Sequence, residues 1–365
     1  MSRKCTSFLI IILILLSTNA FSKQEAISDS LKRNSLVALP YAYYTPETKI
    51  AFGVGSIYSF RSPGSSLHDR PSNVKIALTY TQLKQTILSF IPEIYFNNES
   101  ILFNGFYTFY KFPDKFWGIG NNSPDNAEEN YTPHYLRTFT NLQKRILPGL
   151  YIGMRYQLEY IDIIKTDEDG VLGKGLITGS EGGLASGLGM LISYDTRDHV
   201  YYPTTGRYYQ IYAVLFDQML GSDYKFSHFT FDLRKYYPLK DSHVMAFQSY
   251  NIFIHGNPPF QMLGLLGGAY WMRGYYYGRY RDKNMITFQS EYRFPLFWRL
   301  GGVAFAGFGD VASEIDKFQS GALKLTIGAG LRFMFDTQEK INARLDFGFG
   351  NDGNFGFYAM VLEAF

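Results

Sequence analysis

Apolar and polar residues alternate with a period of two along most of the chain. In the segment KINARLDFGFG, residues 340–350, one set of alternate positions is apolar and the other is mainly polar: Ile341, Ala343, Leu345, Phe347 and Phe349 against Asn342, Arg344 and Asp346. Residues 223–237 and 284–295 follow the same pattern. Successive side chains of a strand point to opposite faces, whereas a helix would scramble these two sets. The pattern therefore predicts β-strands with one apolar and one polar face.

Counting such segments predicts an all-β fold, a single transmembrane antiparallel β-barrel of about 16 strands over residues 36–365. An even number of strands returns the C-terminus to the periplasm, and the longer connections then fall mostly on the outer face. The connection 61–72 is the exception, so the first three strands are the least constrained. The predicted strands are 36–44, 49–60, 73–82, 86–97, 100–112, 134–144, 148–163, 183–197, 205–217, 223–237, 242–255, 284–295, 299–311, 321–335, 340–350 and 354–365.

The first 22 residues have the features of a signal peptide. Arg3 and Lys4 precede an apolar run at residues 8–16 that is too short to span a bilayer, and small or polar residues follow it. We therefore expect residues 1–22 to be removed, with a retained anchor as the alternative, and residues 23–35 to form a short periplasmic segment. The single cysteine, Cys5, precedes the apolar run, so the mature chain lacks cysteine, as suits an oxidising compartment.

Composition supports a membrane barrel. The chain is 18% aromatic and only 18% charged, and a barrel can place that much aromatic surface against lipid and at both interfaces. Removing residues 1–22 takes away two of 35 basic residues and none of 32 acidic ones, which leaves 33 basic and 32 acidic residues. The net charge therefore gives no reason to expect nucleic-acid binding. These features predict the outer membrane of a Gram-negative bacterium, with outer-membrane lipids as partners.

The sequence gives no positive signal for catalysis, a cofactor or a metal. Ser227 and His228 are neighbours on a predicted strand, as are Ser242 and His243, so each pair would point to opposite faces. The spacing of carboxylates in TDEDG, residues 166–170, does not match a Ca²⁺-binding loop, and a solvated outer loop explains it better. We therefore predict that the protein is not an enzyme.

The longest predicted outer connection contains GGAYWMRGYYYGRYRDKN, residues 267–284. Met272, Gly274 and Tyr275 surround Arg273 with residues that favour burial, although a solvated basic loop is the alternative. A buried guanidinium needs a carboxylate partner. We expect this partner to be Asp310, with Glu291 nearby as a second acceptor. Further residues expected in the lumen are Arg293, Arg332, Arg344 and Asp346.

Three motifs resemble the outer-membrane assembly and secretion barrels typified by BamA, TamA and FhaC. They are SYDTRDHVYYPTTGRYY at 193–209, MRGY at 272–275 and FGDVA at 308–312. The resemblance covers most of the mature chain and is strongest from about residue 188 onward. It implies that Arg273, in a hydrophobic-Arg-Gly-aromatic loop motif, pairs inside the lumen with Asp310, in a Phe-x-Asp-x-Gly strand motif. Ala312 stands where the family usually has glycine.

The resemblance also implies a function. Members usually carry periplasmic POTRA domains, for which residues 23–35 leave no room, so we expect a POTRA-less barrel that assists insertion or translocation of outer-membrane components. Clients would pass a lateral seam between the first strand and the last, which ends at Phe365, while the loop around Arg273 plugs the lumen. Pro40 would weaken the first strand, unless it merely precedes that strand.

Two further expectations concern the partner proteins of this barrel and an alternative function. Other outer-membrane or periplasmic proteins are candidate partners, because a barrel without POTRA domains must recruit clients by itself or through a partner. The alternative function is a passive pore or a structural subunit of a larger outer-membrane complex.

Overall fold

The computed structural model describes residues 34–61, 70–337 and 339–365. The predicted signal peptide, 1–22, and all but the last two residues of the predicted segment 23–35 lie outside the described residues. Among the described residues, no helix is long and apolar enough to cross a membrane.

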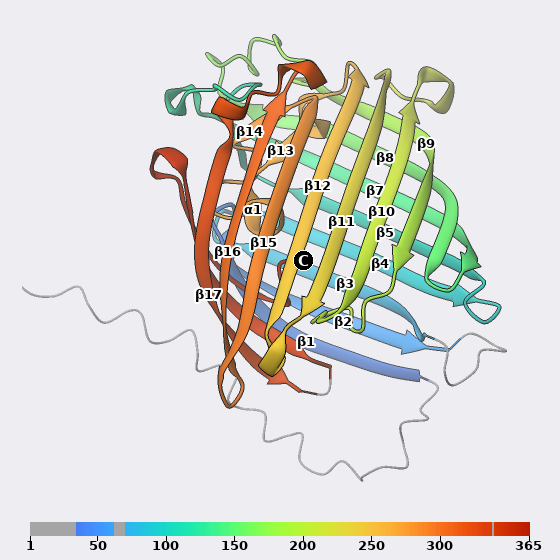
Figure 1. Cartoon of the computed structure of the whole chain (residues 1–365). Helices are drawn as coiled ribbons and strands as arrows, with labels where there is room; N and C mark the ends of the chain where they lie inside the picture. Colours follow the sequence, from blue (N-terminus) through green and yellow to red (C-terminus); the bar gives the residue numbers. More distant parts are fainter. Residues whose placement is uncertain (1–33, 62–69, 338) are drawn as a thin grey trace, which may run out of the picture.

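Sixteen antiparallel strands form a closed barrel, in which each strand pairs with the next along the chain and β1 meets β19 (Figure 1). The predicted all-β barrel is confirmed. The wall strands are β1 (Asn34–Thr45), β2 (Lys49–Phe60), β3 (Ser72–Thr81), β4 (Thr86–Phe96), β5 (Ile101–Lys111), β7 (Glu129–Leu147), β8 (Leu150–Thr166), β9 (Gly182–Asp195), β10 (Gly206–Phe216), β11 (Phe226–Pro238), β12 (Val244–Gly256), β15 (Asn284–Phe297), β16 (Leu300–Ala312), β17 (Lys324–Asp336), β18 (Ile341–Gly350) and β19 (Phe355–Val361).

Three short strands and several short helices lie in the connections. Strand β6 (Asp114–Phe116) pairs with the start of β7, and β13 (Gly264–Leu266) pairs with β14 (Tyr280–Asp282). The one α-helix in the described residues is α1 (Gly268–Trp271). The 3₁₀ helices are η2 (Asp125–Ala127), η3 (Gln218–Leu220), η4 (Lys240–Ser242), η5 (Phe260–Met262), η6 (Ile315–Lys317), η7 (Ser320–Ala322) and η8 (Asn351–Gly353).

The period-two pattern explains the two faces of the wall. On β18, Arg344 and Asp346 are fully buried in the interior, while Leu345 and Phe347 are 38% and 42% exposed on the outside. Apolar side chains exposed to lipid cost nothing there, whereas polar side chains find partners inside the barrel. The barrel is therefore apolar outside and polar within.

The strands differ in length more than the pattern predicts. Strand β7 has 19 residues and β8 has 17, while β19 has only seven. The start of β7 lies beyond the predicted segment 134–144 because β6 pairs with it, as in Asp114 opposite Tyr131. The predicted last strand, 354–365, ends early at Val361.

Candidate functional site

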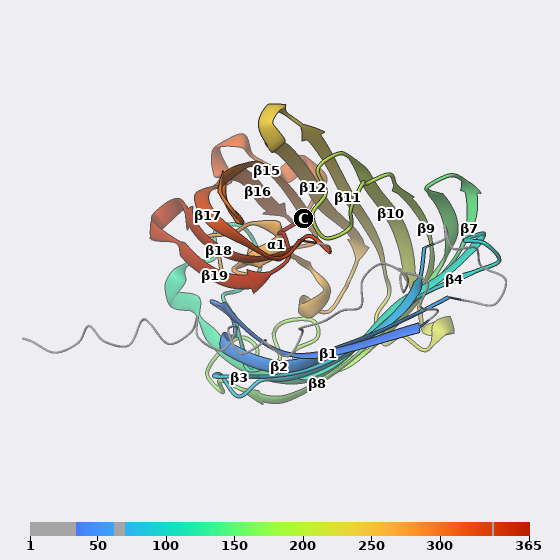
Figure 2. The ribbon, with the colours of Figure 1, turned by 90° about the horizontal axis from the view of Figure 1, so that it is seen from below.

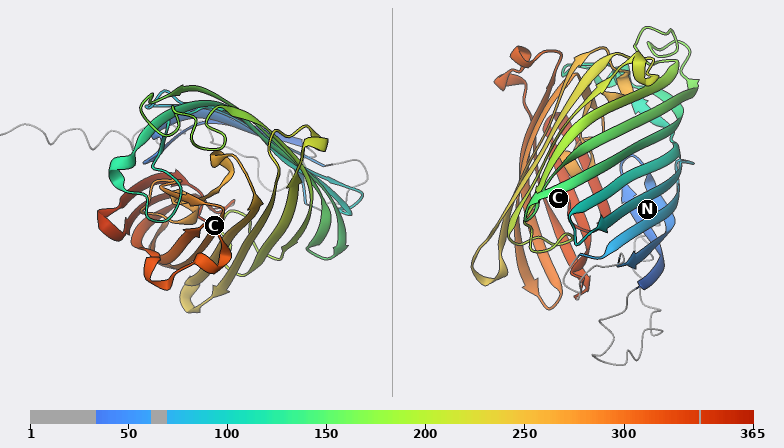
Figure 3. Two further views of the ribbon diagram at one scale, coloured as in Figure 1. Left: turned by 90° about the horizontal axis from the view of Figure 1, so that it is seen from above. Right: turned by 90° about the vertical axis from the view of Figure 1, so that its right-hand side faces the viewer.

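The connection 257–283 folds into the barrel, and its helix α1 lies inside the ring of strands when the barrel is viewed along its axis (Figures 2 and 3). Met272 and Tyr275 are at most 1% exposed. They belong to an apolar cluster that includes inward-facing residues of the wall: Val214, Phe226, Ile252, Met285 and Val311. The structure thus places the whole MRGY motif in the interior of the barrel.

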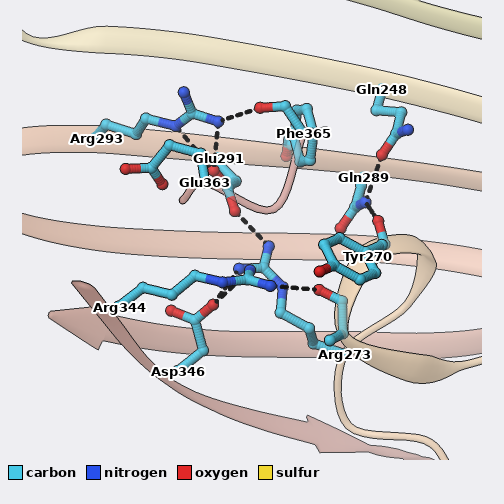
Figure 4. Close-up of polar contacts among 12 residues, drawn as sticks. Gln248, Tyr270, Arg273, Gln289, Glu291, Arg293, Arg344, Asp346, Glu363 and Phe365 are labelled. Carbon is cyan, nitrogen blue, oxygen red and sulfur yellow. Dashed lines mark hydrogen bonds and ion pairs between the residues drawn. The ribbon is translucent and has the colours of Figure 1, made fainter. Parts of the chain in front are cut away.

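Arg273 is fully buried between two carboxylates. Its Nη2 lies 2.5 Å from Glu291 on β15, and its Nη1 lies 2.8 Å from Asp346 on β18 (Figure 4). The guanidinium also lies 3.6 Å from the ring centre of Phe305, on β16. A buried guanidinium with two carboxylates and an aromatic face has its lost hydration offset on several sides. Glu291 is therefore a direct partner of Arg273 and not a secondary one.

The predicted pair between Arg273 and Asp310 is wrong. Asp310 accepts hydrogen bonds from the side chain of Asn121, at 2.5 Å, and from the backbone of Val311. The reason is strand alternation: Asp310 lies five residues beyond Phe305, so it belongs to the opposite face of β16. It is buried by the outer connections instead of by the lumen loop.

Two glycines let the backbone of the loop lie against the wall. Gly274 has a φ of +107°, in the region that favours glycine, and its N–H donates to the Tyr358 hydroxyl at 3.0 Å. A Cβ on Gly348 of β18 would lie 2.7 Å from backbone atoms of Arg273 and Gly274. Tyr275 then donates to the carbonyl of Leu325 and accepts from the N–H of Asn351. The motif is thus held by backbone contacts as well as by its arginine.

The carboxylates around Arg273 belong to a larger buried network. Glu291 also pairs with Arg293 at 2.8 Å, and Asp346 pairs with Arg332 at 2.6 Å and with Arg344 at 3.2 Å. Four arginines thus share these carboxylates and a third one, Glu363, which lies 2.7 Å from Arg332. Leaving any of these charges unpaired in the interior would be costly, so the network fixes β15, β17 and β18 around the loop.

The end of the chain enters the same network. Leu362 has a φ of +70°, and after it the chain turns into the barrel (Figure 2). Glu363 accepts from Asn342 as well as from Arg332, and the carbonyl of Phe365 accepts from Arg293 at 2.9 Å. Phe365 is 5% exposed and packs against wall residues of β11 and β12, namely Tyr236 and Ala246. Its predicted place in the last strand is therefore wrong, because these interior partners draw the tail 362–365 away from the wall.

The junction between β1 and β19 is the least paired in the wall. Strand β1 aligns 12 residues with β2, but only Tyr44 with β19, opposite Ala359. Continuing that register would set Leu362 beside Tyr41, which is where the chain leaves the wall. Residues 34–40 are accordingly exposed. Pro40 lies inside β1, opposite Val54, so it does not merely precede the strand.

Sequence reasoning missed two contacts of the interior. The first is Glu363, which alternation assigned to a strand. The second is Glu47, in the turn between β1 and β2, which accepts from the N–H of Tyr277 at 2.8 Å and so joins the loop to the seam side of the barrel. Burial raises the pKa of Glu47. An acidic residue in a tight turn usually faces water, so no local signal marks this one.

The structure offers no metal site in the described part of the chain, where no group of three or more His, Cys, Asp or Glu residues could hold an ion. Of the two serine–histidine neighbours, His228 is buried on β11 beside Thr230. His243 lies in a turn and not on a strand, within 2.5 Å of the Tyr292 hydroxyl.

Comparison with known proteins identifies the family. Residues 68–362 match the Omp85 superfamily domain. The chain belongs to the Omp85 superfamily. As an Omp85 β-barrel, it is an outer-membrane protein of the Gram-negative type. No curated protein matches the sequence.

Solved structures share the fold of this Omp85 barrel at low identity. BamA from Haemophilus ducreyi lacking POTRA domains 1–3 is similar with a TM-score of 0.60 and 13% identity, over 90% of this chain and 70% of that chain. CdiB from Acinetobacter baumannii has a TM-score of 0.55 and 13% identity, over 90% of this chain and 59% of that one. CdiB from Escherichia coli has a TM-score of 0.57 and 10% identity, over 89% and 62%. The chain thus spans less than two thirds of either CdiB.

Proposed function

We propose that this Omp85 barrel assists the insertion or translocation of outer-membrane components by opening between β1 and β19. The observation that carries the proposal is the single aligned residue pair between these strands, against seven between β18 and β19 and 12 between β1 and β2. Each ladder hydrogen bond contributes about 0.5–1.5 kcal/mol net. The β1–β19 junction is therefore the place where the wall separates at least cost.

The exposed edge of β1 suits a client strand. Among the described residues, none pairs with residues 34–40 on the β19 side, and an unpaired edge is a template for strand addition. Separating the two strands further would extend this edge toward Tyr44. A client segment would add to it by backbone hydrogen bonds, which require no particular client sequence.

The loop 257–283 acts in this proposal as a plug that stays in place while the seam opens. Its arginine is bound to β15 and β18, and the backbone of its motif lies against β18. Neither anchor involves β1, and the N–H of Gly274 also bonds to the Tyr358 hydroxyl of β19, so β19 stays with the loop when β1 separates from it. Opening of the seam therefore leaves the lumen filled, which limits leakage during passage of a client.

A reversible crosslink tests the proposal. Tyr44→Cys combined with Ala359→Cys, in a Cys5→Ser background, places two thiols at the one aligned position of the seam. In proteoliposomes, the reduced protein should accelerate insertion of an unfolded outer-membrane barrel. The compact gel mobility of the inserted barrel measures this rate. Oxidation should abolish the acceleration, and a reductant should restore it.

The matched control is Val54→Cys with Leu78→Cys, an outward-facing aligned pair between the fully paired strands β2 and β3. Its oxidation should leave the insertion rate unchanged. Equal insertion rates for the oxidised and reduced seam variant would contradict the proposal. A large, steady conductance in planar bilayers would indicate the passive pore instead.

A further inference from the structure

Two cations stand opposite one another on the lipid-facing side of the barrel. Arg207 on β10 and Lys235 on β11 are aligned in the strand register, and their inward-facing neighbours along the chain are Tyr208 and Tyr236. Among the described residues, no carboxylate forms an ion pair with either cation, and the Nζ of Lys235 lies 5.0 Å from the ring centre of Tyr237. Like charges directly opposite one another destabilise a strand pair. An anion between them would remove that repulsion.

A hollow of about 450 Å³ lies on the same face, and Lys235 is one of the residues that line it. The strand register places Tyr209, Leu233, Ser249 and Phe288 in one row across four strands. The short side chain of Ser249 stands between the larger Leu233 and Phe288, and it leaves the hollow between them. Lys235 and Phe247 also line it, as do Arg234 and Gln248, whose side chains both bond to Asp232. The hollow is therefore mainly apolar, with a cation at one end.

The position along the strands defines the leaflet. Arg207 is the second residue of β10, and Lys235 is near the end of β11, so both lie at the end of the barrel with the short turn 239–243. The strand count places this end in the periplasm. The facing leaflet of an outer membrane consists of glycerophospholipids, which combine a phosphate with acyl chains.

We propose that this face binds one anionic glycerophospholipid of the periplasmic leaflet, with its phosphate between Arg207 and Lys235 and an acyl chain in the hollow beside Ser249. Opposed Cβ atoms of a strand pair lie about 4.5–5.5 Å apart, a spacing that lets one phosphate bridge two basic side chains. Strand β10 is the ninth of the 16 wall strands, so the site is about half-way around the barrel from the seam. The lipid site and the seam are thus independent, and either proposal can fail alone.

Lipid binding to the purified barrel tests the site. Native mass spectrometry would measure the apparent affinity of the first bound lipid, for phosphatidylglycerol and for phosphatidylcholine of the same chain length. The wild type should prefer phosphatidylglycerol. Arg207→Gln and Lys235→Gln should each reduce this preference about fivefold, and together about 30-fold, as expected for basic side chains at an anionic lipid surface.

The matched control is Lys144→Gln. Lys144 is an exposed cation near the same end of β7, but its aligned neighbours are Ile101 and Ile152 and not a second cation. Its replacement should leave the preference unchanged. A second variant, Ser249→Trp, fills the hollow and should weaken the binding of both lipids equally, with compact gel mobility retained as evidence of folding.

Three outcomes would overturn the proposal. The double variant could keep its preference for phosphatidylglycerol, or Lys144→Gln could lose as much preference as Lys235→Gln, which would indicate diffuse charge attraction. Complete displacement of the lipid by millimolar inorganic phosphate would indicate a site for a free anion instead of a lipid headgroup.

Discussion

The wall from β15 to β18 and the wall around β1 hold their interior contacts by different means. On the first, Arg273 of the loop is paired with Glu291 and Asp346, both fully buried. On the second, neutral groups meet, as in Tyr41 and Thr79 at 2.6 Å. Hydrogen bonds between charged groups are roughly twice as strong as those between neutral ones. The barrel thus places its strongest contacts where the loop is anchored and its weakest strand pairing at β1.

The two regions therefore differ in role: the wall from β15 to β18 holds the loop, and the wall around β1 is the part that can open. A buried ion pair is costly to break one partner at a time, whereas neutral hydroxyl pairs can exchange for water when a wall moves. The bond from Tyr277 of the loop to Glu47 beside β1 links the two regions. The comparison therefore predicts large effects at Arg273, moderate ones at the glycine contact and small ones at Glu47.

Replacing Arg273 by alanine should have the largest effect. Removing one partner of a buried pair costs about 3–5 kcal/mol, because it leaves carboxylates unpaired. We expect Arg273→Ala to lower the temperature at which the barrel loses its compact gel mobility, and Arg273→Lys to rescue it poorly, since lysine lacks the planar fork.

A double-mutant cycle on the same measurement identifies the partner. The losses from Arg273→Ala and Asp346→Ala should not add, because the two side chains share one interaction, whereas those from Arg273→Ala and Asp310→Ala should add. The reverse pattern would show that Asp310, and not Asp346, holds the arginine.

The second largest effect should come from Gly348→Ala, which disturbs the backbone contact between the loop and β18. In Gly348→Ala, the new Cβ would lie 2.7 Å from the backbone of Arg273 and Gly274, so the loop must move away from β18. Overpacking of this kind costs about 1–3 kcal/mol. The same gel-mobility melt measures it, with Gly321→Ala as the control, because a Cβ on Gly321 meets nothing within 4 Å. Equal melting of both variants would mean that the loop does not press against β18.

The link at Glu47 should show the smallest effect, and one that depends on pH. Burial raises the pKa of Glu47 in the folded state, so the folded protein binds the proton more tightly than the unfolded chain. Its contribution to stability is thus fully present below the ordinary pKa of 4.5 and is lost as the pH rises through the folded-state value. Glutamine imitates the protonated form. Glu47→Gln should therefore have the same melting temperature as the wild type at low pH and a higher melting temperature than the wild type at neutral pH.

Strand alternation explains why most of the fold could be predicted from the sequence. The period of two is a local property, and each predicted wall segment overlaps the corresponding strand of the barrel. The same property would have excluded Asp310 as a lumen residue, because it stands an odd number of positions from Phe305. Its acidic side chain and the family motif suggested the wrong face.

The tail and the turn at Glu47 could not be predicted in this way. Phe355, Phe357, Ala359 and Val361 continue the apolar set at a period of two, and nothing in the local sequence marks the inward turn after Leu362. Its cause is tertiary, since Glu363 finds Arg332 and Asn342 across the interior. Likewise, Glu47 accepts its hydrogen bond from a loop more than 200 residues away. Contacts between distant segments decide both positions.

The short β19 also affects the surrounding bilayer. A strand of seven residues extends about 23 Å at about 3.3 Å per residue, and at a tilt of about 45° it crosses about 16 Å of bilayer. The apolar band of such barrels is about 25 Å tall. Lipids beside β19 therefore meet a wall that is too short for them, and they must compress or tilt to cover it, at a cost of fractions of a kcal/mol for each ångström of hydrophobic mismatch. The 19 residues of β7 impose no such strain, so the bilayer is deformed beside β19 and not beside β7.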